Sequence, residues 1–304
     1  MIPPVRLFRA LGAAVASALV VPALAADGGS WAPLAWNGED AWASERAGWR
    51  VVVSVDRGRL VHFGPANTGE NLLFAPPTRD GPNGWGGHRV WLGPQAEWPA
   101  VWPPDPAWEA TAAATATVDG DRLELRMETS AGDWGSLTRV YSWQDDGLAC
   151  AVQVRGGARA AQVIQIMQVR ADAAVRVQAR PEARTPHGFV VLEIGSEDQV
   201  RRTFPWPLGV LREGGRGLVL RTSGTVVKLG FAPQPLVAKL GEVELALAPG
   251  AHTGRVVGEI DDGFTTQVYL GRSGVPFLEL EQLSPRFAAG EDASATILLG
   301  GRRP

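Results

Sequence analysis

Two glutamates near the C-terminal end of the chain have a spacing that suits acid–base chemistry. Glu279 and Glu281 lie two residues apart and alternate with Leu278 and Leu280. Successive side chains of a β-strand point to opposite faces, so both carboxylates are expected on one face. Neighbouring carboxylates repel each other, which favours a proton on one of them and suits a general acid or base. Alternatively, the pair belongs to an ordinary solvated strand face.

A second candidate region is the aromatic stretch at residues 83–109, which holds five of the twelve tryptophans. Its many prolines and glycines exclude a regular helix. We expect a long, irregular but ordered loop, and such indole-rich loops often line a site. Indole faces stack on the apolar faces of sugars and on other flat or cationic ligands, which makes Trp85 and Trp91 candidate binding residues. Alternatively, the loop only closes one end of a β domain.

Polar side chains in and near this stretch add further candidates. His88 and Arg89 follow a Gly-Gly pair that lets backbone approach a ligand closely. An imidazole can act as acid or base near neutral pH, and a guanidinium can grip hydroxyls or a carboxylate. Asp105 could bond hydroxyls or cap a turn. His62 lies in a strand-like run, where a structural role is more common than a binding role.

The N-terminal residues 1–25 have the pattern of a signal peptide. Arg6 and Arg9 precede a small-residue apolar run, and Ala23-Leu24-Ala25 fits a cleavage site. The competing interpretation is an uncleaved anchor, but the run is shorter than the roughly 20 residues that a spanning helix needs. No later segment is long and apolar enough to span a bilayer. We therefore expect an exported protein, periplasmic or secreted.

Composition excludes several classes of function. Without the signal segment the net charge is about −5, and no basic stripe is present, which argues against a nucleic-acid partner. Cys150 is the only cysteine, so no intramolecular disulfide can form. No two histidines have metal-ligand spacing, and no phosphate-binding or nucleophile-elbow motif is present. We expect neither a metal nor a cofactor.

Short apolar or alternating runs separated by Gly- and Asp-containing turns recur from residue 49 onward, and no window shows a capped helical period. This pattern predicts an all-β sandwich or barrel. Residues 26–48 are Trp-rich but look irregular, and we expect them to form an N-terminal arm. Residues 49–304 show no composition break, which predicts a single large β domain.

Four segments resemble the galactose mutarotase-like superfamily. Residues 58–63 and 69–74 resemble its opening strands, including an Asn71-Leu72-Leu73 segment that precedes the ligand loop. Residues 86–94 (GGHRVWLGP) are similar to a loop of the hexose-6-phosphate epimerase branch and closer to an uncharacterised branch, the DUF4380-type proteins. Residues 278–285 are similar to the strand that carries the mutarotase catalytic glutamate.

The resemblance implies a β-supersandwich of large antiparallel sheets with a sugar-binding cleft. In that family a histidine protonates the ring oxygen and a glutamate takes the anomeric proton. Glu281 or Glu279 matches the glutamate, His88 matches the loop histidine of the DUF4380-type pattern, and Asn71 is a candidate binding residue. The family's catalytic histidine lies on a later segment, whereas this chain has no histidine between Trp91 and His187.

Two classes of function therefore stay open. One is an exported aldose epimerase or mutarotase that uses Glu281 and His88. The other is a non-catalytic glycan-binding or structural protein of the cell envelope. The enzyme hypothesis requires the His88 ring and one of the two carboxylates to face each other across a cleft.

Overall fold

The computed structural model describes residues 28–78, 86–98, 113–130, 132–145, 147–183, 185–194, 199–202, 210–222, 226–259, 263–271 and 274–303. Within these ranges the regular structure is β-strand apart from two short 3-10 helices, η1 (Gln95–Glu97) and η2 (Gly132–Trp134). The predicted all-β class is therefore confirmed. No described helix has the length and apolar character needed to cross a bilayer.

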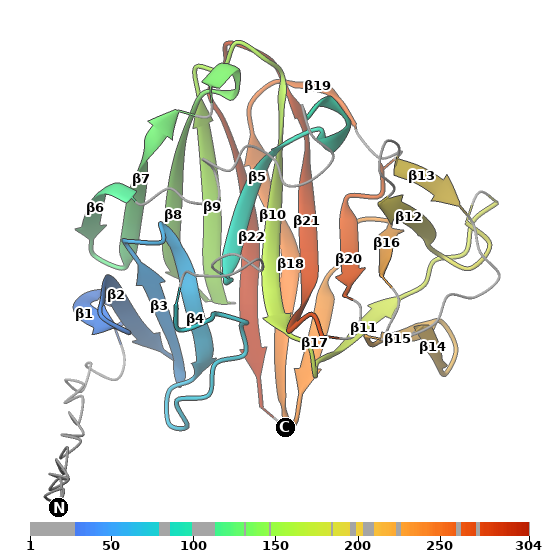
Figure 1. The fold of residues 1–304 in the computed structure, drawn as a ribbon, viewed down its shortest axis with the longest axis horizontal. Helices are drawn as coiled ribbons and strands as arrows, with labels where there is room; N and C mark the ends of the chain where they lie inside the picture. The colour runs from blue at the N-terminus through green and yellow to red at the C-terminus, as the bar shows by residue number, and fades with distance from the viewer. Residues whose placement is uncertain are drawn as a thin grey trace, which may run out of the picture.

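The strands form three antiparallel sheets (Figure 1). The four-stranded sheet contains β1 (Ala32–Trp36), β2 (Glu39–Arg46), β3 (Trp49–Ser54) and β4 (Arg59–Pro65). The eight-stranded sheet runs in the order β13 (Gln199–Arg202), β12 (Val190–Ile194), β16 (Val227–Phe231), β20 (Thr266–Leu270), β21 (Phe277–Phe287), β10 (Ala161–Arg170) and β5 (His88–Gly93), and β19 (Val256–Gly258) pairs with β21.

The third sheet has ten strands and forms the other layer of the sandwich. Its order is β14 (Val210–Glu213), β15 (Gly217–Leu220), β11 (Ala174–Gln178), β17 (Leu236–Leu240), β18 (Val243–Thr253), β22 (Ala293–Arg302), β9 (Gly147–Arg155), β8 (Ser136–Gln144), β7 (Arg122–Ser130) and β6 (Ala113–Asp119). In Figure 1, β5, β10 and β21 lie in front of this sheet.

The main hydrophobic core lies between the two large layers. It joins Leu278 and Leu280 of β21 with Leu245 of β18 and Ile297 of β22. Val51 of β3 belongs to the same cluster, so the four-stranded sheet packs into the common core. The alternating burial along β17 and β22 follows from this arrangement, because only one face of the ten-stranded sheet meets the core.

The expected irregular arm at residues 26–48 is wrong for residues 32–46, which form β1 and β2. Two residues, Asn37 and Gly38, separate these strands, and both have positive φ (50° and 81°). This backbone is that of a type I′ hairpin turn, for which Asn-Gly is the preferred sequence. Ala47 and Gly48 repeat it between β2 and β3 (φ 50° and 77°).

Two local expectations also need correction. Residues 71–74 contain a single bridge, Leu73 to Val169, in place of the expected strand. The stretch expected to be an irregular loop contains β5, and residues 88–93 are all buried. His252 lies in β18 and pairs with Ala295 of β22.

Candidate functional site

Glu279 and Glu281 lie near the centre of the eight-stranded sheet and share one face, as their spacing predicts. In the ladder, Glu279 pairs with Gln168 of β10 and Tyr269 of β20, and Glu281 pairs with Ile166 and Gln267. Leu278 and Leu280 point to the other face and join the main core. The two carboxylates therefore point away from the inter-sheet core.

Two cations reach these carboxylates from strands on either side of β21. Arg89 of β5 donates from Nη1 to Glu279 Oε1 at 3.1 Å, across the intervening strand β10. Lys228 of β16 donates from Nζ to Glu281 Oε2 at 2.8 Å, across β20. Gln168 adds a bond from Nε2 to Glu279 Oε1 at 2.8 Å. We call Arg89, Gln168, Lys228, Glu279 and Glu281 the polar cluster.

Neither ion pair of the polar cluster joins residues of the same cross-strand row; each runs diagonally to the neighbouring row. Lys228 pairs with Tyr269, which lies opposite Glu279, yet its ammonium binds Glu281. Arg89 pairs with Ile166, which lies opposite Glu281, yet its guanidinium binds Glu279. Each carboxylate is thus held by a diagonal contact, and both are fixed in place on the sheet.

The polar cluster is almost fully buried, which excludes the solvated strand face considered above. Glu281 is 1% exposed, and Lys228 and Glu279 are each 7% exposed. Removing two ion pairs from water has a large desolvation cost, and well-packed apolar residues are often as stable. The amide oxygen Oε1 of Gln168 also has no hydrogen-bond partner within the described structure, although Gln168 is 0% exposed. The cluster is therefore a candidate site.

Trp91 lies on the same strand face as Arg89, but it is not a free stacking platform. The Arg89 guanidinium carbon lies 4.6 Å from the centroid of the Trp91 ring. Trp98 contacts Trp91 edge-on, with ring centroids 5.3 Å apart. The indole is 3% exposed, so its role in the described structure is to support Arg89. Trp85 and Asp105, the other candidates of this stretch, lie outside the described residues.

His88 lies on the opposite face of the sheet from the two glutamates. It pairs with Met167, which pairs with Leu280, and all three belong to the core-facing rows. Its Nε2 lies 3.1 Å from Gln165 Oε1, and its Nδ1 lies 3.4 Å from Tyr141 Oη of the ten-stranded sheet. The expected pairing of His88 as acid with Glu281 as base is therefore wrong, because the sheet itself separates the two groups.

The surroundings of His88 also keep it neutral. Burial holds its pKa well below 6.5, and the nearby Arg139 and Arg59 lower that pKa further. A neutral imidazole fits the contacts, with Nε2 donating to Gln165 and Nδ1 accepting from the Tyr141 hydroxyl. Both ring nitrogens are thus occupied, which assigns His88 to the structure of the core.

His62 and Asn71, the two remaining candidates, lie at the four-stranded sheet. Asn71 accepts from the backbone of Phe63 and Leu73 and donates to Val61, so its amide holds the chain after β4. Burial, with Arg50 nearby, lowers the pKa of His62 to about 4. Its Nε2 has no hydrogen-bond partner within the described structure. Neither side chain contacts the polar cluster through a described hydrogen bond.

Buried arginines hold the backbone that leads into β5. Arg57 donates to the carbonyls of Pro76 and Pro77 and is bound by the Glu39 carboxylate at 2.8 and 3.0 Å. Arg59 donates to the Gly86 carbonyl at 3.3 Å. These contacts fix the residues on both sides of 79–85 and so help to place Arg89.

The Gly-Gly pair before β5 is required by close backbone contacts. Gly86 and Gly87 have φ values of 69° and 70°. A Cβ atom on Gly86 would lie 2.3 Å from the Phe74 carbonyl oxygen, and one on Gly87 would lie 2.1 Å from that of Leu60. The expected close approach of this backbone is therefore to the protein's own chain.

Sequence reasoning missed Lys228 and Gln168. Lys228 interrupts the apolar run Val226–Phe231, and a lysine inside a strand that is otherwise apolar indicates a buried partner of opposite charge. Gln168 is one of three glutamines in β10, a strand whose other residues are mainly apolar. Both signals are present in the sequence, but neither identifies the carboxylate that the Lys228 or Gln168 side chain binds.

The described fold is similar to solved structures of mutarotase-like proteins. A galactose mutarotase-like protein from Lactobacillus casei is 11% identical with a TM-score of 0.59, and the match covers 86% of this chain and 100% of that one. A galactose mutarotase related enzyme from Lactobacillus acidophilus is 8% identical, with a TM-score of 0.57 and coverage of 86% and 97%. A putative mutarotase from Salmonella typhimurium is 11% identical, with a TM-score of 0.51 and coverage of 90% and 94%.

No family model and no curated protein sequence matches the chain. The resemblance to the DUF4380-type branch therefore stays a prediction. At these identities the structural likeness concerns the fold alone, and it agrees with the large antiparallel sheets described above. The chain has the galactose mutarotase-like fold.

Proposed function

We propose that this protein binds a carbohydrate or a sugar-like molecule at the polar cluster. The observation that carries the proposal is the pair of crossed ion pairs, Arg89–Glu279 and Lys228–Glu281, buried on the sheet face that points away from the core. Carboxylates accept hydrogen bonds from sugar hydroxyls, while the guanidinium and ammonium groups donate to them. The free Oε1 of Gln168 supplies one more acceptor.

Preorganisation supports this proposal. Each charged group of the polar cluster already has a fixed partner, so little side-chain entropy remains to be lost on binding. The face also lies near the middle of the sheet, where strands on both sides restrain β21. Rigid elements position a binding constellation more accurately than loops do.

Binding can be tested by isothermal titration calorimetry with a panel of aldoses and uronic acids. We expect saturable binding of at least one sugar, and at least about tenfold weaker binding by Glu279→Gln, because the neutral amide holds the Arg89 guanidinium less firmly and offers one acceptor oxygen in place of two. The matched control is Glu124→Gln, in which the lost carboxylate lies on β7 of the other large sheet and pairs with exposed Arg122. Equal affinities in the two variants would contradict the proposed site.

A second candidate function is aldose epimerisation at the same cluster. One carboxylate, Glu281 or Glu279, would take the proton of the anomeric hydroxyl while an acid protonates the ring oxygen. The C1–O5 bond then breaks to give the open-chain aldehyde, and closure on the other face yields the other anomer. His88 cannot serve as this acid, because it lies on the other side of the sheet.

Among the nitrogen-bearing side chains of the polar cluster, Lys228 is the one whose cationic group can donate a proton to the ring oxygen. The guanidinium of Arg89 stays protonated, and the amide of Gln168 has no proton to give at neutral pH. The Lys228 ammonium lies 2.8 Å from Glu281 Oε2, so acid and base would be adjacent. This juxtaposition is the observation that favours the enzyme over a binding module.

Polarimetry of freshly dissolved α-anomers separates the two functions. An epimerase should accelerate mutarotation, and Glu281→Gln and Lys228→Met should each lower the rate by about 10²-fold or more. His88→Gln, if folded, should keep the rate within a few-fold. A binding module should leave mutarotation at the solvent rate while it still binds sugar in calorimetry.

Export of the protein is part of the same proposal and rests on the N-terminal segment alone. Arg6, the apolar run and Ala23-Leu24-Ala25 support cleavage near Ala26 and a periplasmic or secreted location. The test is the mass of the protein recovered from a secreting host. A mature N-terminus that still contains Arg6 would contradict cleavage.

A further inference from the structure

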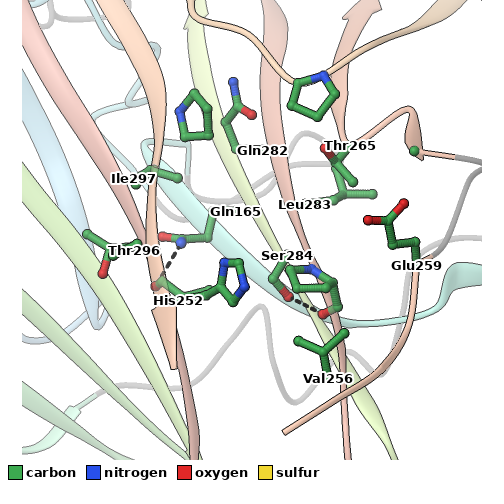
Figure 2. Close-up of a pocket in the computed structure, with 17 residues that line it drawn as sticks. Gln165, His252, Val256, Glu259, Thr265, Gln282, Leu283, Ser284, Thr296 and Ile297 are labelled. Atoms are coloured by element: carbon green, nitrogen blue, oxygen red, sulfur yellow. Dashed lines mark hydrogen bonds between the residues drawn. The ribbon is translucent and has the colours of Figure 1, made fainter. Parts of the chain in front are cut away.

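A hollow lies on the side of β21 opposite the polar cluster, between the two large sheets (Figure 2). Its volume is about 320 Å³, within the usual range of small-molecule sites. Gln165 and Gln282 form part of its floor, and they are paired in the ladder on the core-facing side of the sheet. The hollow is therefore separated from the polar cluster by the sheet.

Three strand irregularities meet around this hollow. The register shifts between Pro249 and His252 where β18 pairs with β22, and between Val256 and Gly258 where β19 pairs with β21. A third shift lies in β10, between residues 162 and 164. Bulges re-aim side chains and are common beside functional sites. His252 follows one of these shifts and lines the hollow, as Figure 2 shows.

The polar groups of the floor are already satisfied. Gln282 donates to the Gln234 carbonyl and accepts from Thr266, each at 3.0 Å. Gln165 donates to the Ala295 carbonyl, and Ser284 accepts from the Val163 backbone and donates to Pro285. A floor without unmet donors or acceptors does not require water or a polar ligand atom at its base, and so accepts an apolar group.

The rim differs from the floor in exposure and charge. His252, Val256 and Glu259 are exposed, and the side chains of His252 and Glu259 make no hydrogen bond or ion pair within the described structure. No lysine or arginine lines the hollow, so the Glu259 carboxylate is the one permanent charge among its described lining residues. Val256 at the rim and Ile297 deeper in add apolar surface.

We propose that this hollow is a second binding site, for a small molecule that carries a protonated amine on a compact apolar body. The apolar body lies on the satisfied floor against Ile297, and the ammonium reaches the Glu259 carboxylate at the rim. The imidazole of His252 closes the opposite side. This site is independent of the polar cluster and does not depend on sugar binding.

The test uses three phenylalkyl probes of similar size: phenethylamine, its neutral analogue 2-phenylethanol and the anion 3-phenylpropanoate. Ligand-observed NMR titration of the full chain should give saturable binding of the amine, at least about threefold tighter than the alcohol, with the anion weakest. Glu259→Gln should remove the preference for the amine over the alcohol. Glu242→Gln, a change at another exposed glutamate that does not line the hollow, should keep it.

A second variant tests the place of the apolar body. Ala251 is exposed at the rim, so Ala251→Trp should fold normally and block the opening, weakening both the amine and the alcohol by at least about fivefold. Thermal melting of each variant checks that it is folded. Equal binding of amine and alcohol to the wild type, an unchanged preference in Glu259→Gln, or no saturable binding of the amine would each overturn the proposal. Loss of sugar binding in polar-cluster variants would leave this result unaffected.

Discussion

Glu281 and Lys228 allow the stability of the polar cluster to be separated from its binding role. Glu281→Ala leaves the Lys228 ammonium buried without its 2.8 Å partner, and we expect it to lower the free energy of unfolding by about 3–5 kcal/mol. The double variant Lys228→Met/Glu281→Met removes both charges and should recover most of that loss. Urea unfolding measures both effects.

Sugar binding should follow the opposite pattern in the same two proteins. If the cluster is a site, the double variant stays stable but binds no sugar, because the donors and acceptors are gone. A double variant that keeps wild-type affinity would show that the ion pair only supports the sheet.

His62 predicts a loss of stability in mild acid. Its pKa in the folded protein is lowered from 6.5 to about 4 by burial and by Arg50. Between these two pH values the His62 side chain is therefore protonated in the unfolded chain but neutral in the folded protein. The contribution of His62 to the free energy of unfolding should therefore be fully present above pH 6.5 and be lost as the pH falls toward 4. The contribution of this one group is at most about 3 kcal/mol.

The matching measurement is urea unfolding at pH 7.5 and at about pH 4.5 for the wild type and His62→Leu. The variant should lose less stability than the wild type over this interval. His88, whose pKa is also lowered by burial, contributes a loss of the same sign that remains in the variant. An identical pH dependence in both proteins would show that His62 is not the group responsible.

At the scale of single residues, the sequence predicts which face of a strand a side chain occupies better than it predicts which side chain it will pair with. The i, i+2 spacing places Glu279 and Glu281 on one face, because a strand alternates with a period of two. The same rule puts His88 and Arg89 on opposite faces once residues 88–93 are a strand, and the expectation of an irregular loop hid this consequence. Lys228 reaches Glu281 through pairing between distant segments, which no local pattern specifies.

At the scale of elements, Glu39 of strand β2 helps to hold the backbone near the candidate site through its ion pair with Arg57. Glu39→Gln removes the charge that holds the fully buried Arg57, which in turn binds the carbonyls of Pro76 and Pro77. We expect a loss of about 3 kcal/mol in unfolding free energy. Amide hydrogen exchange at Gly87, whose N–H binds the Phe74 carbonyl, should also become faster.

Glu45→Gln is the control for this prediction within the same strand. Glu45 pairs with Arg50 at 3.5 Å, and both side chains are partly exposed, so the change should cost less than about 1 kcal/mol. The Gly87 amide should exchange as in the wild type. Equal effects of the two substitutions would mean that the Arg57 contacts do not restrain this backbone.

The strands can be predicted from the sequence where an alternating or apolar run is bounded by a clear turn sequence. The Asp56-Arg57-Gly58 turn joins β3 and β4, and the alternating residues 123–127 lie in β7. The hairpin β1–β2 was missed although Asn37-Gly38 is a strong hairpin signal, because short strands rich in Ala and Trp show little alternation. The Asn-Gly turn signal predicts this hairpin better than the alternation of its strands does.

At the scale of the whole molecule, the first strands belong to the sandwich and do not form a separable arm. The Trp143 indole of β8 donates to Ser44 of β2 at 2.8 Å, and the Trp31 indole donates to the Asp121 carbonyl at 2.9 Å. Ala41 and Ala43 of β2 pack with Val52 and Val61 in a small core of their own. Residues 28–46 therefore connect the four-stranded sheet with the ten-stranded sheet.

A chain that starts at Trp49 should consequently fail to fold cooperatively. It would expose the pairing edge of β3, uncover Val52 and leave the fully buried Arg57 without Glu39. A chain that starts at Asp27 keeps every described residue and is the matched control, for which we expect one sharp calorimetric transition. Because Arg57 and Arg59 of this sheet hold the backbone on both sides of 79–85, the shorter chain should also lose any sugar binding. A Trp49-start chain that melts at the same temperature as the control would restore the interpretation of residues 26–48 as a dispensable arm.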